Sequence, residues 1–99
     1  MILSYYATFT ISEDGDMCTI SIPDFGETVD VPYVSDDDIK RKARDQLGIA
    51  YWERVTDGGK PAPEPTQYKE KLTGRKRVMR IDCDYDEFLS RLKVKVFQL

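Results

Sequence analysis

Strict alternation of apolar and polar residues near the amino terminus constrains the fold of this chain most. Over residues 3–11 every odd position is apolar, and every even position is serine, tyrosine or threonine. Successive side chains of a strand point to opposite faces, so the pattern predicts a half-buried strand. Residues 13–16 are acidic or glycine and suit a turn, and the alternation resumes over residues 18–22. We therefore expect an antiparallel hairpin.

The next segments predict a third strand and a long helix. Pro23 and Gly26 should redirect the chain, because proline cannot donate to a strand ladder and glycine bends tightly. A short strand over residues 28–31 would follow. Ser35 is a good helix N-cap, and apolar residues recur at helical spacing over residues 39–51.

The predicted helix contains one glycine and ends at a pair of them. Gly48 costs a helix about 1 kcal/mol unless a close backbone contact requires it. Gly58 and Gly59, followed by three prolines up to Pro65, prevent the helix from continuing. Residues 59–74 therefore form a predicted proline-containing connector.

The remaining residues complete the predicted fold. Residues 78–81 mark a fourth strand, residues 84–92 a short helix, and residues 93–99 an extended stub. The fold class is α+β: a small three- to four-stranded, mainly antiparallel sheet with one long helix packed on it, in the order βββαβ. A chain of 99 residues buries one core, so residues 1–92 should form one domain.

Composition excludes several classes of function. The sequence has no histidine, which removes serine/histidine and cysteine/histidine nucleophile pairs and almost every common zinc site. Cys18 and Cys83 are expected to be buried thiols rather than a disulfide. No apolar run approaches the ~18 residues of a membrane span, and no signal-peptide core precedes the first strand. We expect a cytoplasmic protein that is not an enzyme.

Charge is distributed unevenly along the chain. Residues 1–40 hold nine acids and one base, a net charge of −8, whereas residues 41–99 hold nine acids and fourteen bases, a net charge of +5. An acidic half is a poor surface for nucleic acid and suits a basic protein partner. The candidate partner-binding residues are Tyr6 on the polar face of the first strand, Asp14 and Asp16 in the turn, and Asp36 and Asp37 at the helix start.

The sequence leaves the role of Tyr6 open but argues against a calcium site. Tyr6 could anchor a partner or could pack in a homodimer, and the sequence does not choose between them. The Asp82-Asp84-Asp86 series resembles the start of a calcium loop, but Glu87 stands where that loop needs glycine. We expect no metal and no cofactor.

Several motifs together resemble the HicB antitoxin family. They are the first strand with Tyr6-Ala7-Thr8-Phe9, the step Ile22-Pro23-Asp24-Phe25-Gly26, the capped helix, the glycine and proline run from Thr56 to Thr66, and the stretch from Asp82 to Leu89. The run after the helix is the most specific of these motifs. The resemblance covers about residues 3–92.

The resemblance implies a degraded ribonuclease-H-like fold without nuclease activity. It also implies a homo-oligomer that binds a small basic ribonuclease toxin of the HicA type and covers its catalytic surface. The first strand carries no acid, which agrees with inactivity. Family members usually append a DNA-binding module. Residues 93–96 resemble the strand that opens such a module, but its two helices are missing. We therefore expect no specific operator binding by these 99 residues.

Two other functions remain as alternatives. One is a homo-oligomeric interaction domain that has no toxin partner. The other is a magnesium-dependent nuclease, for which Asp24, Asp30 and Asp82 are the acids that could meet at strand ends.

Overall fold

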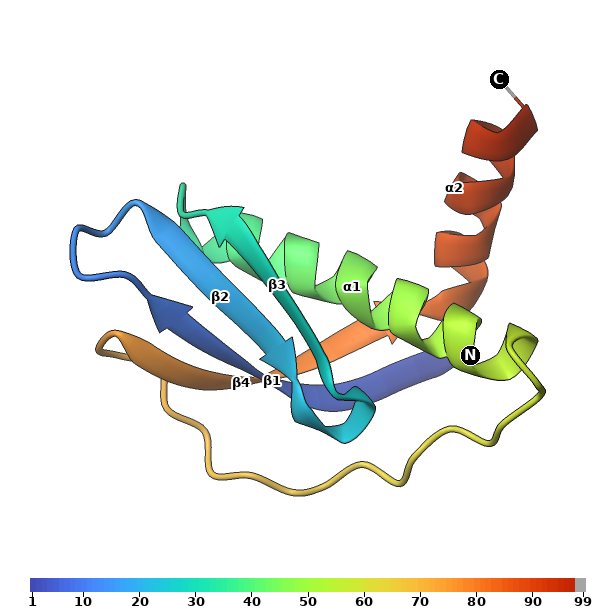
Figure 1. Cartoon of the computed structure of the whole chain (residues 1–99), viewed down its shortest axis with the longest axis horizontal. Helices are drawn as coiled ribbons and strands as arrows, with labels where there is room; N and C mark the ends of the chain where they lie inside the picture. Colours follow the sequence, from blue (N-terminus) through green and yellow to red (C-terminus); the bar gives the residue numbers. More distant parts are fainter. Residues whose placement is uncertain (98–99) are drawn as a thin grey trace.

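A computed structural model describes the backbone of residues 1–97 and the side chains of residues 1–92 (Figure 1). The described elements are β1 (Ile2–Ile11), β2 (Met17–Ile22), the 3₁₀ helix η1 (Pro23–Phe25), β3 (Glu27–Pro32), α1 (Asp36–Thr56), β4 (Lys76–Asp84) and α2 (Tyr85–Phe97). The strands within this part of the chain form one antiparallel sheet in the order β3-β2-β1-β4. The α+β prediction, with one long helix on one face of the sheet, is confirmed.

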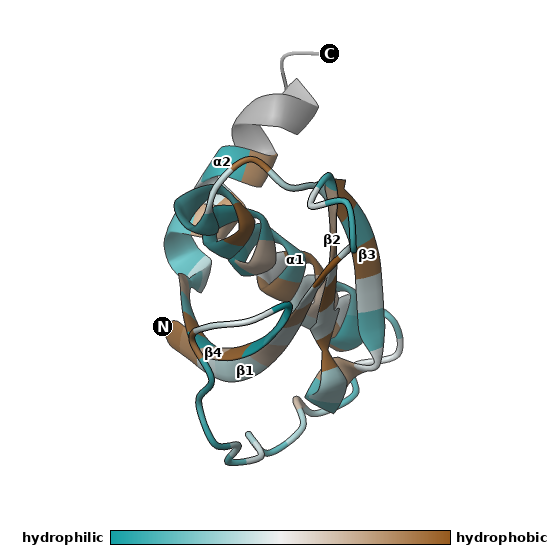
Figure 2. Cartoon of the chain, turned by 90° about the vertical axis from the view of Figure 1, so that its left-hand side faces the viewer, coloured by the Kyte–Doolittle hydropathy of each residue, from teal (hydrophilic) through white to brown (hydrophobic). Residues whose placement is uncertain are grey.

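The core lies between α1 and the sheet, as the alternation in the sequence predicts. The odd residues of β1 face α1 and are at most 7% exposed, and Cys18, Ile20 and Ile22 of β2 lie beside them. Ile39, Ala43 and Leu47 of α1 are fully buried against this surface. Bands of apolar and polar residues alternate along the strands (Figure 2). Each fully buried large apolar side chain contributes roughly 1.5–3 kcal/mol to the transfer free energy of folding.

The connector between α1 and β4 determines the direction of β4. α1 ends near the start of β1, and the connector, residues 57–75, carries the chain back to the hairpin end of the sheet (Figure 1). β4 therefore runs antiparallel to β1, and the Ile11 N–H donates to the Arg75 carbonyl oxygen over 2.8 Å.

Side chains from three elements fasten the connector to the domain, and the first is Arg54 of α1, whose Nε donates to the carbonyl oxygen of Pro61 over 2.7 Å. The Tyr5 hydroxyl donates to the carbonyl oxygen of Pro63 over 2.6 Å. The carboxylate of Asp24, in η1, accepts hydrogen bonds from the Thr66 amide over 2.8 Å and from the Thr66 hydroxyl over 2.6 Å. These contacts hold a segment that otherwise has no helix or strand beyond a single bridge at Lys71.

The predicted extended stub over residues 93–99 is wrong. α2 begins at Tyr85 and continues to Phe97, with the Asp84 carboxylate accepting from the Glu87 amide at its start. No glycine or proline interrupts this stretch, and its leucine, arginine and lysine residues are good helix formers. A short alternation of lysine and valine does not outweigh the helix that precedes it. Gln98 and Leu99 lie outside the described residues.

Neither described helix is long and apolar enough to cross a membrane.

Candidate functional site

Four acidic residues predicted to bind a partner lie at one end of the molecule. Asp14 and Asp16 occupy the turn between β1 and β2, and Asp36 and Asp37 begin α1. Tyr33, which follows β3, links the two groups: its amide donates to the Asp16 carbonyl oxygen over 2.8 Å, and its hydroxyl donates to Asp36 over 2.6 Å. We call these four aspartates and the exposed Met17 and Val34 beside them the acidic end.

The turn at the acidic end is built by its own side chains. Asp14 Oδ1 accepts from the Ser12 hydroxyl over 2.6 Å and from the Asp16 amide over 3.0 Å. These two hydrogen bonds stabilise the carboxylate and lower the pKa of Asp14. Gly15 sits at φ 76°, a left-handed conformation that glycine adopts without steric cost. The turn is therefore fixed in a shape that exposes Asp14 and Asp16.

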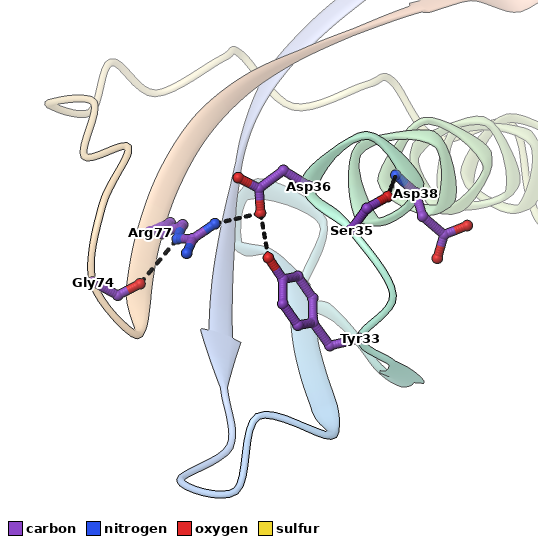
Figure 3. Close-up of polar contacts among 6 residues, drawn as sticks. All are labelled: Tyr33, Ser35, Asp36, Asp38, Gly74 and Arg77. Atoms are coloured by element: carbon purple, nitrogen blue, oxygen red, sulfur yellow. Dashed lines mark hydrogen bonds and ion pairs between the residues drawn. The ribbon is translucent and has the colours of Figure 1, made fainter.

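A three-residue cluster joins the start of α1 to β4 (Figure 3). Asp36 Oδ1 accepts from the Tyr33 hydroxyl and from the Arg77 guanidinium, and Arg77 Nε also donates to the Gly74 carbonyl oxygen over 2.9 Å. The Tyr33 hydrogen bond, followed by the Arg77 contact, lowers the pKa of Asp36. The same hydrogen bond raises the pKa of Tyr33. Asp36 is thus held by its own chain.

The helix start separates the roles of the three consecutive aspartates. Ser35 caps α1 as predicted, with its hydroxyl accepting from the Asp38 amide over 3.1 Å. Asp38 forms ion pairs with Arg41 at 2.6 Å and Lys42 at 2.9 Å, and these contacts lower its pKa. Asp37 is exposed, and within residues 1–92 its side chain forms no ion pair. Asp37 is therefore the member of the three that is free to meet a partner.

The sequence interpretation missed the apolar part of the acidic end. Val34 is 74% exposed and Met17 is 41% exposed. A hydrophobic residue before an N-cap often packs on the fourth residue of its helix, here Ile39, which is fully buried. Val34 instead stays in solvent. Its position directly before Ser35 was the available sequence signal, but only the exposure distinguishes a surface residue from a packed one.

The charge asymmetry of the sequence is partly cancelled in space. β4 lies beside β1, so cations from the second half of the chain reach the acidic first half. Arg77 pairs with Asp36, and Arg75 Nη1 lies 3.9 Å from the Glu13 carboxylate. At the acidic end, Asp14, Asp16 and Asp37 therefore keep charges that no cation of residues 1–92 pairs with.

Tyr6 lies away from the acidic end. It is half-buried on the outer face of the sheet, opposite Arg80, and its ring meets the edge of the Tyr68 ring with centroids 5.9 Å apart. The turn begins six residues further along the chain, a distance of about 20 Å at strand spacing. The structure thus gathers the four predicted aspartates and leaves Tyr6 packed against the connector.

The three acids considered for a metal-dependent nuclease do not converge. Asp30 lies on β3 and Asp82 on β4, at opposite edges of the sheet, about 14 Å apart across it at normal strand spacing. The register also places Asp30 level with Thr10 of β1 and Asp82 level with Ser4, about 20 Å apart along the strands. Asp24 holds Thr66 of the connector. Among the described residues there is no group of three side chains that could hold a metal ion. A two-metal site needs ions ~3.5–4 Å apart, which this arrangement does not provide.

Comparison with known proteins adds no identification. No protein-family model matches the sequence, no curated protein matches it, and no solved structure matches the chain.

Proposed function

We propose that this chain is an antitoxin-type inhibitor, which binds a small basic ribonuclease toxin of the HicA type and covers its catalytic surface. The observation that carries the proposal is the acidic end. There, Asp14, Asp16 and Asp37 are exposed on two different segments that Tyr33 holds together. The motif resemblance to the HicB family supports the same function. A cytoplasmic location and self-association belong to this proposal.

The acidic end combines the two properties that such a contact needs. The exposed Val34 and Met17 supply apolar area, and the carboxylates beside them supply charge. Interfaces bind through a desolvated apolar centre, while charges at the rim increase the association rate and select the partner. The turn and the helix cap are already ordered by hydrogen bonds, so binding costs little conformational entropy there.

Inhibition by this surface requires no chemistry. A basic ribonuclease must expose cationic residues to bind RNA, and a rigid acidic surface competes for the same residues. Steric coverage and charge neutralisation then block access to the substrate.

Co-expression with the neighbouring reading frame tests the proposal. We expect a small basic protein encoded there to co-purify with this chain, and its toxicity in cells to be relieved by it. The double variant Asp16→Lys/Asp37→Lys should slow association about tenfold or more, since both charges are exposed. Asp14 is left unchanged because it builds the turn.

A matched control reverses two charges at the opposite end of α1 and on the connector. Glu53→Lys/Glu64→Lys makes the same change in net charge at two exposed positions, and it should leave binding unchanged. Equal loss in both double variants would show that only net charge matters. Failure of the unaltered chain to co-purify, or to relieve toxicity, would reject the function.

A further inference from the structure

The free edge of β4 carries an interrupted strand ladder. Lys71 of the connector pairs with Val78 through two backbone hydrogen bonds of 2.9 Å, so the Val78 backbone points away from β1. Backbone groups alternate in direction along a strand, and those of Arg80 and Asp82 therefore point the same way. The connector does not continue along them, because Tyr68 lies against Tyr6 on the outer face of the sheet. Within residues 1–92, the N–H and C=O groups of Arg80 and Asp82 have no partner at this edge.

A groove of about 390 Å³ lies along this edge. It is lined by Lys40 and Arg44 of α1, Glu70 and Leu72 of the connector, and Met79, Arg80, Ile81 and Asp82 of β4. Met79 and Ile81 are buried and face α1, whereas Leu72 is 59% exposed. The groove therefore offers apolar surface directly beside free backbone donors and acceptors.

The wall of the groove on α1 is cationic. Lys40 and Arg44 lie one helical turn apart, and within residues 1–92 neither forms an ion pair. The acids of β4 do not neutralise them, because Asp82 accepts from the Ser4 hydroxyl over 2.6 Å and pairs with Arg80 at 3.1 Å. Lys40 and Arg44 thus have no ion-pair partner of their own, and with Arg80 they outnumber Glu70 and Asp82, the two acids that line the same groove.

We propose that this edge binds an extended acidic segment of a partner protein, which adds to the sheet as a strand next to β4. The segment forms backbone hydrogen bonds with Arg80 and Asp82, the usual way in which peptides extend an open sheet edge. Its residue opposite Ile81 lies on the α1 face, where a glutamate packs its methylenes on the apolar floor and directs its carboxylate to Lys40 and Arg44. Pairing of two β4 edges from two copies is disfavoured, because it brings these cations together.

This surface is distinct from the acidic end in both charge and chemistry. The acidic end attracts a basic folded protein, whereas the β4 edge takes an acidic strand. The inference therefore does not depend on the proposed antitoxin function, and either can fail while the other holds.

The probe is a blocked peptide of sequence Thr-Val-Thr-Glu-Thr-Val-Thr, titrated into the ¹⁵N-labelled full chain. In this peptide the glutamate and both valines share one face. We expect saturable shifts of the Arg80 and Asp82 amide resonances, with a dissociation constant on the order of 1 mM or lower. The same peptide with lysine in place of glutamate should bind about tenfold more weakly.

Two pairs of variants test the groove itself. Lys40→Glu/Arg44→Glu should weaken binding about tenfold, whereas Lys60→Glu/Lys69→Glu, the same change at exposed connector positions, should not. Arg80→Pro should abolish binding because it removes an outward N–H that the β1–β4 ladder does not use. Arg80→Thr, which keeps that N–H, is the control, and circular dichroism of each variant verifies the fold.

Each other result overturns the inference. Absence of saturable shifts at several millimolar peptide would show that the edge does not bind such a segment. Shifts confined to the acidic end, or equal affinity for the lysine peptide, would show that the groove does not select acidic strands. Sedimentation that reveals self-association lost in Lys40→Glu/Arg44→Glu would instead identify a second copy of this chain as the occupant.

Discussion

Phe88 of α2 packs directly on the backbone of α1 at Gly48. A β-carbon built on Gly48 would lie 2.6 Å from Phe88 Cδ1 and within 2.8 Å of two further ring atoms. Both residues are buried. The contact explains a glycine in the middle of a 21-residue helix: the absent side chain lets the second helix approach the first.

Gly48→Ala should destabilise the protein although alanine is the better helix former. Overpacking costs typically ~1–3 kcal/mol, against a helix-propensity gain of about 1 kcal/mol. Urea denaturation should therefore show a net loss of roughly 1 kcal/mol. Combining the change with Phe88→Leu should make the two effects less than additive. Glu53→Ala, an exposed position of the same helix, is the control. An increase in stability with Gly48→Ala would show that α2 does not pack as described.

The Asp36 cluster should make stability depend on pH in the acid range. The pKa of Asp36 is lower in the folded chain than the usual value of ~3.9, so its contribution is present above pH 4 and is lost as pH falls through the folded pKa. Asp36 is half exposed, which limits the contribution to about 1 kcal/mol or less. Asp36→Asn should lower the unfolding free energy at pH 7, and this difference between the variant and the unaltered chain should shrink as the pH falls below about 4. Asp37→Asn controls for net charge; a gap that widens toward low pH contradicts the assignment.

Asp24→Ala should release the connector without unfolding the domain. The change removes two hydrogen bonds to Thr66, each worth about 1–3 kcal/mol because the acceptor is charged. Limited proteolysis should then cleave within residues 57–75 faster than in the unaltered chain. Asp37→Ala changes the same residue type at an exposed position outside the connector and should leave the rate unchanged. Equal cleavage rates for Asp24→Ala and the unaltered chain would show that other contacts hold the connector.

The described residues should not bind operator DNA specifically. Arg75, Arg77 and Arg80 are cations that could contact phosphates, and each lies within 4 Å of an acid of its own chain. Breaking these ion pairs would consume part of the free energy gained from phosphate contacts. A gel-shift series at ~150 mM salt should show no sequence-dependent shift at submicromolar protein. A sequence-dependent shift would show that these ion pairs break readily and that this part of the chain does bind DNA specifically.

Local patterns predicted most of the fold because each of them reports a local cause. Alternation over residues 3–11 predicted β1, and Ser35 predicted the helix cap. The glycines and prolines after residue 57 predicted the connector. The prediction of an extended stub at the end of the chain was wrong because the alternating pattern in residues 93–96 is short. A helix already nucleated at Tyr85 extends through such residues at little cost.

The candidate site was predictable in part for the same reason. Turn and cap chemistry placed Asp14, Asp16, Asp36 and Asp37 at element ends, but their common location follows from the sheet order. Arg77 reaches Asp36 across 41 positions of sequence, and no local pattern reports such a contact. The exposure of Val34 likewise depends on what does not pack over it.

The position of β1 between β2 and β4 has a consequence for biosynthesis. β2 can pair with β1 as soon as the hairpin leaves the ribosome. Ile2 of β1 pairs with Asp84 of β4, so this pairing forms only after β4 has been synthesised. Such distant pairing folds slowly because a long loop has to close first. Until then, the amino-terminal strand keeps an unpaired edge while α1 is already made, and β4 of another nascent chain can occupy it. We therefore expect domain-swapped dimers to be the main misfolded product when ribosomes translate this message in close succession.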